Sequence, residues 1–187
     1  MNIQEIFLQL TNHMLEGMMV HEQLANYFAF LVLQGYQCCH EYHHLDETLN
    51  YRRLQQYYIE HYNLLLPEPQ PTIIQTIPPA WHNIDRQQIT IQDKQEGIKK
   101  GMLAWQNWEY ETKKLYEQSY SNLLSIAEVA SAEQIKELII DVDNELVEVE
   151  QMYLSILAID IDLTVIIPEQ KELFKTYSKK IKKIMEN

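Results

Sequence analysis

Glycine and cysteine are both scarce in this chain of 187 residues. Only four glycines occur, and they stand apart at positions 17, 35, 97 and 101. A phosphate-binding loop needs several glycines close together, so the sequence gives no support to nucleotide binding. The two cysteines, Cys38 and Cys39, are adjacent and cannot act as a conventional disulfide framework. Reduced thiols are typical of cytoplasmic proteins.

Positive charge and long hydrophobic runs are also in short supply. Lys and Arg number 15 against 27 Asp and Glu, which gives a net charge of −12. Because binding to nucleic-acid phosphates needs clustered basic side chains, we expect no nucleic-acid partner. The apolar runs fall far short of the roughly 20 residues that a membrane span requires. The opening residues MNIQE lack the features of a secretory signal, so we expect a cytoplasmic protein without a membrane segment.

The sequence does contain a strong helical pattern, which prolines interrupt in only a few places. The six prolines stand at positions 67, 69, 71, 78, 79 and 168. Between them, apolar residues recur at the three- and four-residue spacing that places them on one face of an α-helix. In the first block this face comprises Phe7, Leu10, Met14, Gly17, His21, Leu24, Phe28, Leu31 and Gly35. The spacing predicts a helix over residues 3–37, with Asn2 and Glu5 forming a capping box at its start.

The same reasoning predicts four further helices within a single domain over residues 1–187. A turn near residues 38–40 leads to a second helix over 41–66, which Pro67 ends because proline lacks the N–H needed to continue. Residues 67–90 are too long for a tight turn, so we expect a crossover that runs along the bundle. The other predicted helices cover 91–129, 132–158 and 169–185. The expected architecture is all-α: an antiparallel four-helix bundle with a long crossover between its second and third helices and a short fifth helix.

Three segments of the predicted helices, each with at least one acidic residue, resemble the ferritin-like family. They read HEQLANYFAFL at residues 21–31, WEYETKKLY at 108–116 and DVDNELVE at 141–148. Each places carboxylates near the middle of a long amphipathic helix, and the resemblance covers about residues 3–160. It implies a ferritin-like bundle as the fold.

The resemblance also implies a di-iron centre. Active members of the family hold two irons between the four helices, because hard carboxylate oxygens bridge iron ions and imidazole fixes a terminal position. By resemblance, the ligand on the first helix is Glu22, and that on the third helix is Glu111 or Glu109. On the fourth helix the ligands are Glu145 and Glu148, which are three residues apart and share a face.

The second predicted helix departs from the family pattern, in which it carries Glu-x-x-His. With a turn near residue 39, Glu22 should face about residue 56, where the sequence RRLQQY at 52–57 has neither Glu nor His. The motif does occur at Glu41 and His44, but these residues lie at the predicted turn. They are therefore too far along the bundle to reach Glu22.

Two interpretations of this departure stay open. In one, His61 with Glu60 supplies the missing ligand from a level nearer the amino end of the first helix. In the other, Arg52 or Arg53 turns inward and neutralises the acids in place of metal, because unpaired buried carboxylates are strongly destabilising.

Histidines elsewhere have simpler interpretations. His21 lies on the apolar face of its helix, where a hydrogen-bonded core histidine is more common than a metal ligand. Residues 38–44 hold two thiols and three imidazoles, a combination that suits zinc or copper but is also compatible with an incidental exposed turn.

The sequence therefore supports a ferritin-like protein with a carboxylate-bound di-iron centre that acts in iron or oxidant handling. The predicted ligands are Glu22, Glu111, Glu145, Glu148 and His61. The alternative is a metal-free bundle that serves as a binding or structural module, and whether the protein is an enzyme is left open. Since long bundles with exposed aromatic residues pair through helix faces, we expect a homo-oligomer, with a dimer favoured.

Overall fold

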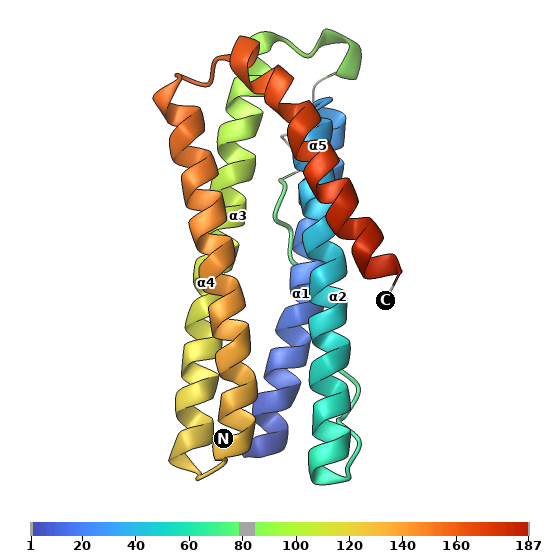
Figure 1. The fold of residues 1–187 in the computed structure, drawn as a ribbon, viewed down its shortest axis with the longest axis vertical. Coiled ribbons are helices and arrows are strands. Elements are labelled where there is room, and N and C mark those ends of the chain that lie inside the picture. Colours follow the sequence, from blue (N-terminus) through green and yellow to red (C-terminus); the bar gives the residue numbers. More distant parts are fainter. Residues whose placement is uncertain (1, 79–84, 187) are drawn as a thin grey trace.

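The computed structural model describes residues 2–78 and 85–186, and the secondary structure of these residues is helical, without strands. A short 3₁₀ helix occupies Arg86–Gln88, and the five α-helices are α1 (Ile3–Phe30), α2 (Gln34–Tyr62), α3 (Ile91–Ser125), α4 (Val129–Ala158) and α5 (Leu163–Met185). The first four form a long bundle, and α5 crosses α2 obliquely near one end (Figure 1). The predicted all-α bundle with a short fifth helix is confirmed. None of the helices in the described residues combines the length and apolar character that crossing a bilayer requires.

Helix α1 begins where the sequence predicts and ends seven residues early. The predicted capping box is present, with Glu5 N donating to Asn2 Oδ1 (2.9 Å) and Asn2 N donating to Glu5 Oε2 (2.8 Å). The turn lies at residues 31–33 rather than near 38–40. Val32 adopts the left-handed region with φ 61°, and its two buried leucine neighbours anchor the turn in the core. Burial, rather than a glycine or a proline, therefore closes this turn.

The position of this turn sets the register of the first helical pair. The rings of His43 and His21 lie side by side, with centroids 5.2 Å apart. Further from the turn, Glu47 lies against Gly17, where an added Cβ would stand 2.8 Å from Glu47 Oε1. The glycine therefore leaves room for an inward carboxylate. The predicted pairing of Glu22 with about residue 56 is wrong, because it assumed a later turn.

The crossover follows α1, as predicted for its first part. Backbone N–H groups of this segment donate to α1 side chains: Gln70 N to Asn12 Oδ1 (2.6 Å), Thr72 N to Glu16 Oε1 (2.7 Å) and Thr76 N to Gln23 Oε1 (2.9 Å). The segment starts after Tyr62, four residues before the predicted helix end. Residues 79–84 of the predicted crossover lie outside the described residues. The three hydrogen bonds to α1 side chains satisfy backbone N–H groups of the crossover, which has no helical structure there to pair them.

The remaining helix boundaries differ modestly from those predicted. Helix α3 starts at Ile91 after a Thr90–Asp93 capping box, and α3 and α4 are joined by residues 126–128 instead of 130–131. Ala127 ends α3 in the left-handed region with φ 62°. Helix α5 begins at Leu163 rather than residue 169, because the Asp162 side chain accepts from Thr164 N and starts the helix before Pro168. Pro168 removes one intrahelical donor near this end and does not break the helix.

The apolar core consists of two clusters stacked along the bundle. One gathers around Val20, Phe28, Trp105 and Val149 on the side nearer α5. The other gathers around Phe7, Met14, Leu54, Tyr116 and Val142 on the side nearer the N-terminus. On α2, α3 and α4, polar side chains lie in the layer between the two clusters, and on α1 His21 directly follows Val20 at the edge of the first cluster. That layer contains the candidate site.

Candidate metal centre

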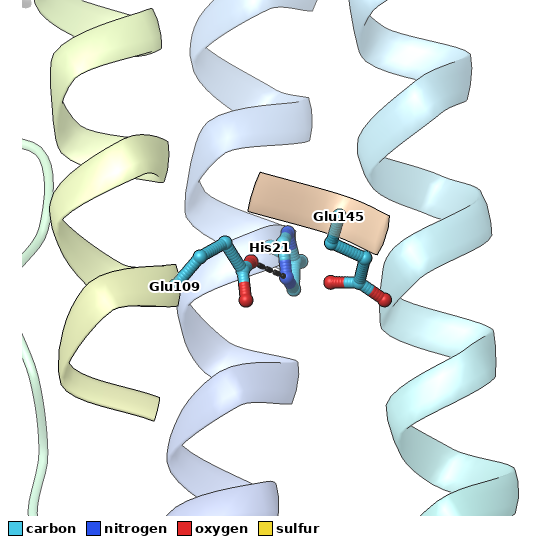
Figure 2. A group of neighbouring side chains, drawn as sticks. All are labelled: His21, Glu109 and Glu145. Atoms are coloured by element: carbon cyan, nitrogen blue, oxygen red, sulfur yellow. Dashed lines mark ion pairs between the residues drawn. The ribbon is translucent and has the colours of Figure 1, made fainter. Parts of the chain in front are cut away.

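Between the two apolar clusters, all four bundle helices contribute side chains of metal-ligand type. We call these six residues the buried cluster: His21 from α1, His40, His43 and Glu47 from α2, Glu109 from α3, and Glu145 from α4. The three histidines and Glu109 are buried, and Glu47 and Glu145 are partly buried. Ligand atoms of His21, Glu109 and Glu145 all lie within 4.8 Å of one another. Figure 2 shows the His21 imidazole between the two carboxylates. His21 Nε2 is 3.5 Å from Glu109 Oε1, and His43 Nδ1 is 3.5 Å from Glu145 Oε1.

Several polar atoms of the buried cluster lack a hydrogen-bond partner. His21 Nδ1 lies 3.1 Å from His40 Nδ1, so each of these rings has one partner. Among the described residues, the following buried atoms have none: His21 Nε2, His40 Nε2, His43 Nδ1, His43 Nε2 and Glu47 Oε2. Two of these five, His21 Nε2 and His43 Nδ1, have a carboxylate oxygen at 3.5 Å, and the other three have no such contact within the part of the chain that the structure describes. An unpaired buried polar atom costs about 1–3 kcal/mol, so this layer calls for an explanation. A bound metal ion would satisfy such imidazole and carboxylate atoms.

Burial sets the protonation of the inner carboxyl groups. Burial and the Glu145 carboxylate raise the pKa of Glu109 well above its usual range. Burial and the Glu145 and Asp46 carboxylates do the same to the pKa of Glu47. Without a cation nearby, both groups therefore favour the neutral acid.

The three imidazoles respond in different ways. Burial and the neighbouring rings lower the pKa of His21 and of His40 well below the usual range. Burial alone would also lower the pKa of His43, but Glu145 and the Cys39 thiol outweigh it, and the pKa of His43 is raised. The metal-free cluster thus has two neutral rings and one ring that forms an ion pair with Glu145.

Trp105 fixes the orientation of the Glu109 carboxylate. Its indole Nε1 donates to Glu109 Oε1 at 2.9 Å, one helical turn along α3. The same indole packs against the rings of His40 and His43, with centroids 4.8 and 5.1 Å away. A side chain held on both its polar and its apolar parts is preorganised, which is what a ligand-supporting residue needs.

A small cavity lies among the carboxylates of the buried cluster. It has a volume of about 10 Å³, and Glu47, Glu109 and Glu145 contribute to its wall. That space is on the scale of a single water-sized sphere. The cavity itself is lined by carboxylates, and the His21 imidazole lies next to two of them, Glu109 and Glu145. A donor set of oxygen and imidazole suits first-row transition metals, whereas calcium and magnesium prefer oxygen donors alone.

The structure brings one of the five predicted ligands into the buried cluster. That residue is Glu145. Glu148, three residues further along α4, instead accepts a hydrogen bond from the Tyr177 hydroxyl of α5 and lies 4.0 Å from Lys180 Nζ. Glu148 therefore ties α5 to α4 and stands outside the group that surrounds His21.

The other three predicted ligands lie on the surface. Glu22 is exposed and accepts a hydrogen bond from Asn26 Nδ2 (3.2 Å). The Glu111 side chain is 70% exposed and lies 3.6 Å from Lys114 Nζ. His61 is exposed near the end of α2. The structure does not place any of these side chains in the buried cluster.

The alternatives considered for the second helix also lie outside the cluster. Glu41 is exposed and accepts from Gln37 Nε2 (2.8 Å), while His44 Nδ1 lies 3.0 Å from the Met18 carbonyl oxygen. Arg52 and Arg53 are exposed and do not neutralise the buried acids directly.

Residues 38–44 belong to α2 and do not form an exposed turn. Cys38, Cys39, His40 and His43 are all buried, and Cys38 Sγ lies 3.5 Å from Ser178 Oγ of α5. Among the described residues, no group with metal-ligand spacing combines these thiols with the imidazoles. The zinc or copper interpretation of this segment therefore has no support from the geometry.

Glu109 was the alternative to Glu111 in the sequence analysis, and its spacing carried a signal for an inward position. Glu109 follows Trp105 by four residues and precedes Thr112 by three, on the apolar face of α3, whereas Glu111 is two residues away on the opposite side. His43 and Glu47 were missed for another reason. The predicted turn placed them near the end of the bundle.

His13, next to this layer, makes a pH-dependent contribution to stability. Its ring stacks on Trp108 with centroids 4.4 Å apart, and burial lowers the pKa of His13 to about 4. The unfolded chain binds this proton near pH 6.5, so the stabilisation is present above pH 6.5 and is lost as the pH falls toward 4. When the pH falls, we expect His13→Gln to lose about 2 kcal/mol less unfolding free energy than the wild type. This is smaller than the lowered pKa of His13 alone implies, because Glu16 at 3.7 Å favours the charged ring.

Urea unfolding of both proteins at pH 7 and pH 4.5 measures this difference. His61→Gln, at an exposed position, is the control and should follow the wild type. Equal acid sensitivity of the His13 variant and the wild type would contradict the assignment.

No family model and no curated protein sequence matches the chain. Among solved structures, it is similar to a ferritin of Archaeoglobus fulgidus that was engineered into a closed form by site-directed mutagenesis. The two share 12% sequence identity and superpose with a TM-score of 0.71 over 93% of this chain and 96% of that chain. The chain has a ferritin-like fold. Within this ferritin-like bundle, the buried cluster occupies the interior layer to which all four long helices contribute side chains.

Proposed function

We propose that the buried cluster binds transition-metal ions, with iron as the principal candidate, and that the protein acts in iron or oxidant handling. The observation that carries this proposal is the convergence of imidazole and carboxylate atoms from four helices, several of them without hydrogen-bond partners, in an apolar interior. The ferritin-like fold supports iron in particular, because the similar solved structure is a ferritin.

In this proposal His21, Glu109 and Glu145 hold the ion, with His43 and Glu47 as further donors. The two imidazoles of this donor set, His21 and His43, make the centre richer in nitrogen than the carboxylate-dominated site that the resemblance implies. Iron bound by such ligands would supply electron exchange with dioxygen or peroxide.

The chain's own residues prepare the site for a cation. The two apolar clusters exclude bulk water from both ends, which strengthens electrostatic attraction inside. Trp105 holds the Glu109 carboxylate in place. Because Glu109 and His43 favour their protonated forms, a metal ion must displace protons, and its binding should strengthen as the pH rises.

The metal-free alternative requires another way to neutralise the buried acids. Arg52 and Arg53 are exposed and do not reach these acids, so in the metal-free protein Glu47 and Glu109 are neutralised by protonation. In the metal-binding protein a metal ion neutralises these carboxyl groups, whereas in the metal-free module protons do.

Anaerobic titration of the full chain with Co(II), a spectroscopic substitute for Fe(II), separates them. We expect saturable binding of at least about one ion per chain, visible absorption bands from nitrogen and oxygen ligands, and no displacement by millimolar Mg(II). Fewer than about 0.2 Co(II) per chain at saturation would remove the metal-binding proposal and leave the structural module. The cytoplasmic location, the homodimer and the absence of a nucleic-acid partner stay predictions.

A further inference from the structure

A cleft open to solvent lies between α2 and α4. It has a volume of about 350 Å³, and its wall includes Asp46 of α2, Asp141 and Glu145 of α4, and the His43 ring. Helix α2 packs mainly on α1 and α5, and α4 packs on α3, so α2 and α4 make few direct contacts. Figure 1 shows these two helices on the same side of the bundle.

This cleft adjoins the small cavity of the buried cluster. Asn50, Asp141 and Glu145 line both spaces, and the inner one continues to Glu47 and Glu109. The exposure of the side chains falls along this path, from 22% for Glu145 to 1% for Glu109. Glu145 therefore stands where the solvent-facing cleft meets the interior.

The cleft also contains a buried imidazole with an unpaired nitrogen. The His43 side chain is 2% exposed; its Nδ1 lies 3.5 Å from Glu145 Oε1, and its Nε2 has no hydrogen-bond partner among the described residues. The charges on the wall favour a cation, because its four carboxylates outnumber its three basic groups: Asp46, Asp141, Glu145 and Glu148 against Arg53, Lys180 and the His43 ring. A cleft with an excess of negative charge raises the local concentration of cations.

Three other directions toward the buried cluster are blocked by side chains of the described residues. One apolar cluster lies on each side of it along the bundle axis. On the α5 side, the buried Tyr177 ring lies 6.2 Å from the His43 ring, and its hydroxyl is bonded to Glu148. The cleft between α2 and α4, by contrast, is lined by polar side chains that lead toward the buried cluster.

We propose that this cleft is a binding site for a hydrated divalent cation on its way to the buried cluster. Asp46 and Asp141 are the outer carboxylates that first replace water molecules of the ion, and Glu145 passes it inward to the histidines. Carboxylate oxygens act first because they exchange readily with bound water, whereas imidazole binding requires loss of more of the hydration shell. This inference rests on the proposed function and adds a second, outer site to it.

Stopped-flow mixing of the full chain with Co(II) under anaerobic conditions tests the outer site. The test variant is Asp46→Asn with Asp141→Asn, which keeps side-chain size and removes two negative charges. The control variant is Glu111→Gln with Glu117→Gln, which removes the same charge from exposed positions on α3. For the test variant we expect the association rate constant to fall about tenfold and to depend less on salt, with the same Co(II) content at saturation.

The outcomes are distinct. A control rate within about twofold of the wild type, together with the slowed test variant, supports the outer site, because net charge alone would slow both variants equally. Equal rates in the two variants would overturn it and leave the buried cluster as the metal site. If the wild-type chain takes up no Co(II), the proposed function fails, and the outer site fails with it.

Discussion

Replacement of Glu109 by Gln is expected to weaken Co(II) binding by about 100-fold or more. Glutamine keeps an oxygen that can accept from Trp105 Nε1, so the fold around the site should persist, while the negative charge that binds the cation is lost. Glu111→Gln, two residues along the same helix, is the matched control. It removes the same charge from a side chain that is 70% exposed and should leave the affinity unchanged.

Equilibrium dialysis against Co(II), with metal content measured on both sides of the membrane, provides the two affinities. Far-UV circular dichroism checks that both variants are folded. Equal affinities would show that the inward carboxylate is not a ligand. A loss of Co(II) affinity in Glu111→Gln alone would identify Glu111, the residue that the sequence favoured, as the ligand.

The same Glu109→Gln substitution is expected to stabilise the metal-free protein at pH 8, by about 1–3 kcal/mol. Burial and Glu145 raise the pKa of Glu109, so the folded chain holds this proton more tightly than the unfolded chain. The associated stability is fully present below the unfolded pKa of about 4.5 and is lost as the pH rises through the raised folded value. Glutamine does not titrate and escapes this loss.

Guanidinium unfolding of chelator-treated protein at pH 4.5 and pH 8 tests this prediction. The variant should gain stability relative to the wild type only at the higher pH, and Glu111→Gln should stay within about 0.5 kcal/mol of the wild type at both. With saturating Co(II) the order should reverse, because only the wild type gains the free energy of tight binding. If the variant is less stable than the wild type at pH 8 without metal, Glu109 is not a buried carboxyl group whose ionisation destabilises the fold.

The helical architecture was predictable because local signals agree with one another. The apolar face around Phe7 and Phe28, the capping boxes at Asn2 and Thr90, and the prolines after residue 66 all favour long helices joined by one long crossover. Each of these signals lies within a few residues of the feature that it predicts. Such local signals do not depend on tertiary packing.

The first turn was not predictable in the same way. It contains no glycine or proline, and Val32 has a side chain that disfavours the left-handed conformation it adopts. Its neighbours Leu31 and Leu33 hold it in place through burial, which is a tertiary effect. The misplaced turn then moved His43 and Glu47 away from His21 in the predicted hairpin, so the second-helix ligands were sought around residue 56.

The choice between neighbouring acids depended on helix geometry. Consecutive residues on an α-helix are separated by roughly 100°, so Glu22 points well away from the direction of His21, and Glu111 points nearly opposite to Glu109. The resemblance to ferritin-like proteins favoured glutamates at these positions and drew attention from His21, which lies on the apolar face. The family resemblance therefore predicted a carboxylate ligand on α1, Glu22, whereas the structure places the His21 imidazole in the cluster.

Anomalous X-ray diffraction from a crystal soaked anaerobically in Fe(II), recorded on both sides of the iron absorption edge, tests the metal centre most directly. We predict an iron peak among the four bundle helices, bonded to His21, Glu109 and Glu145. Iron peaks confined to surface carboxylates, with none inside the bundle, would contradict the proposal.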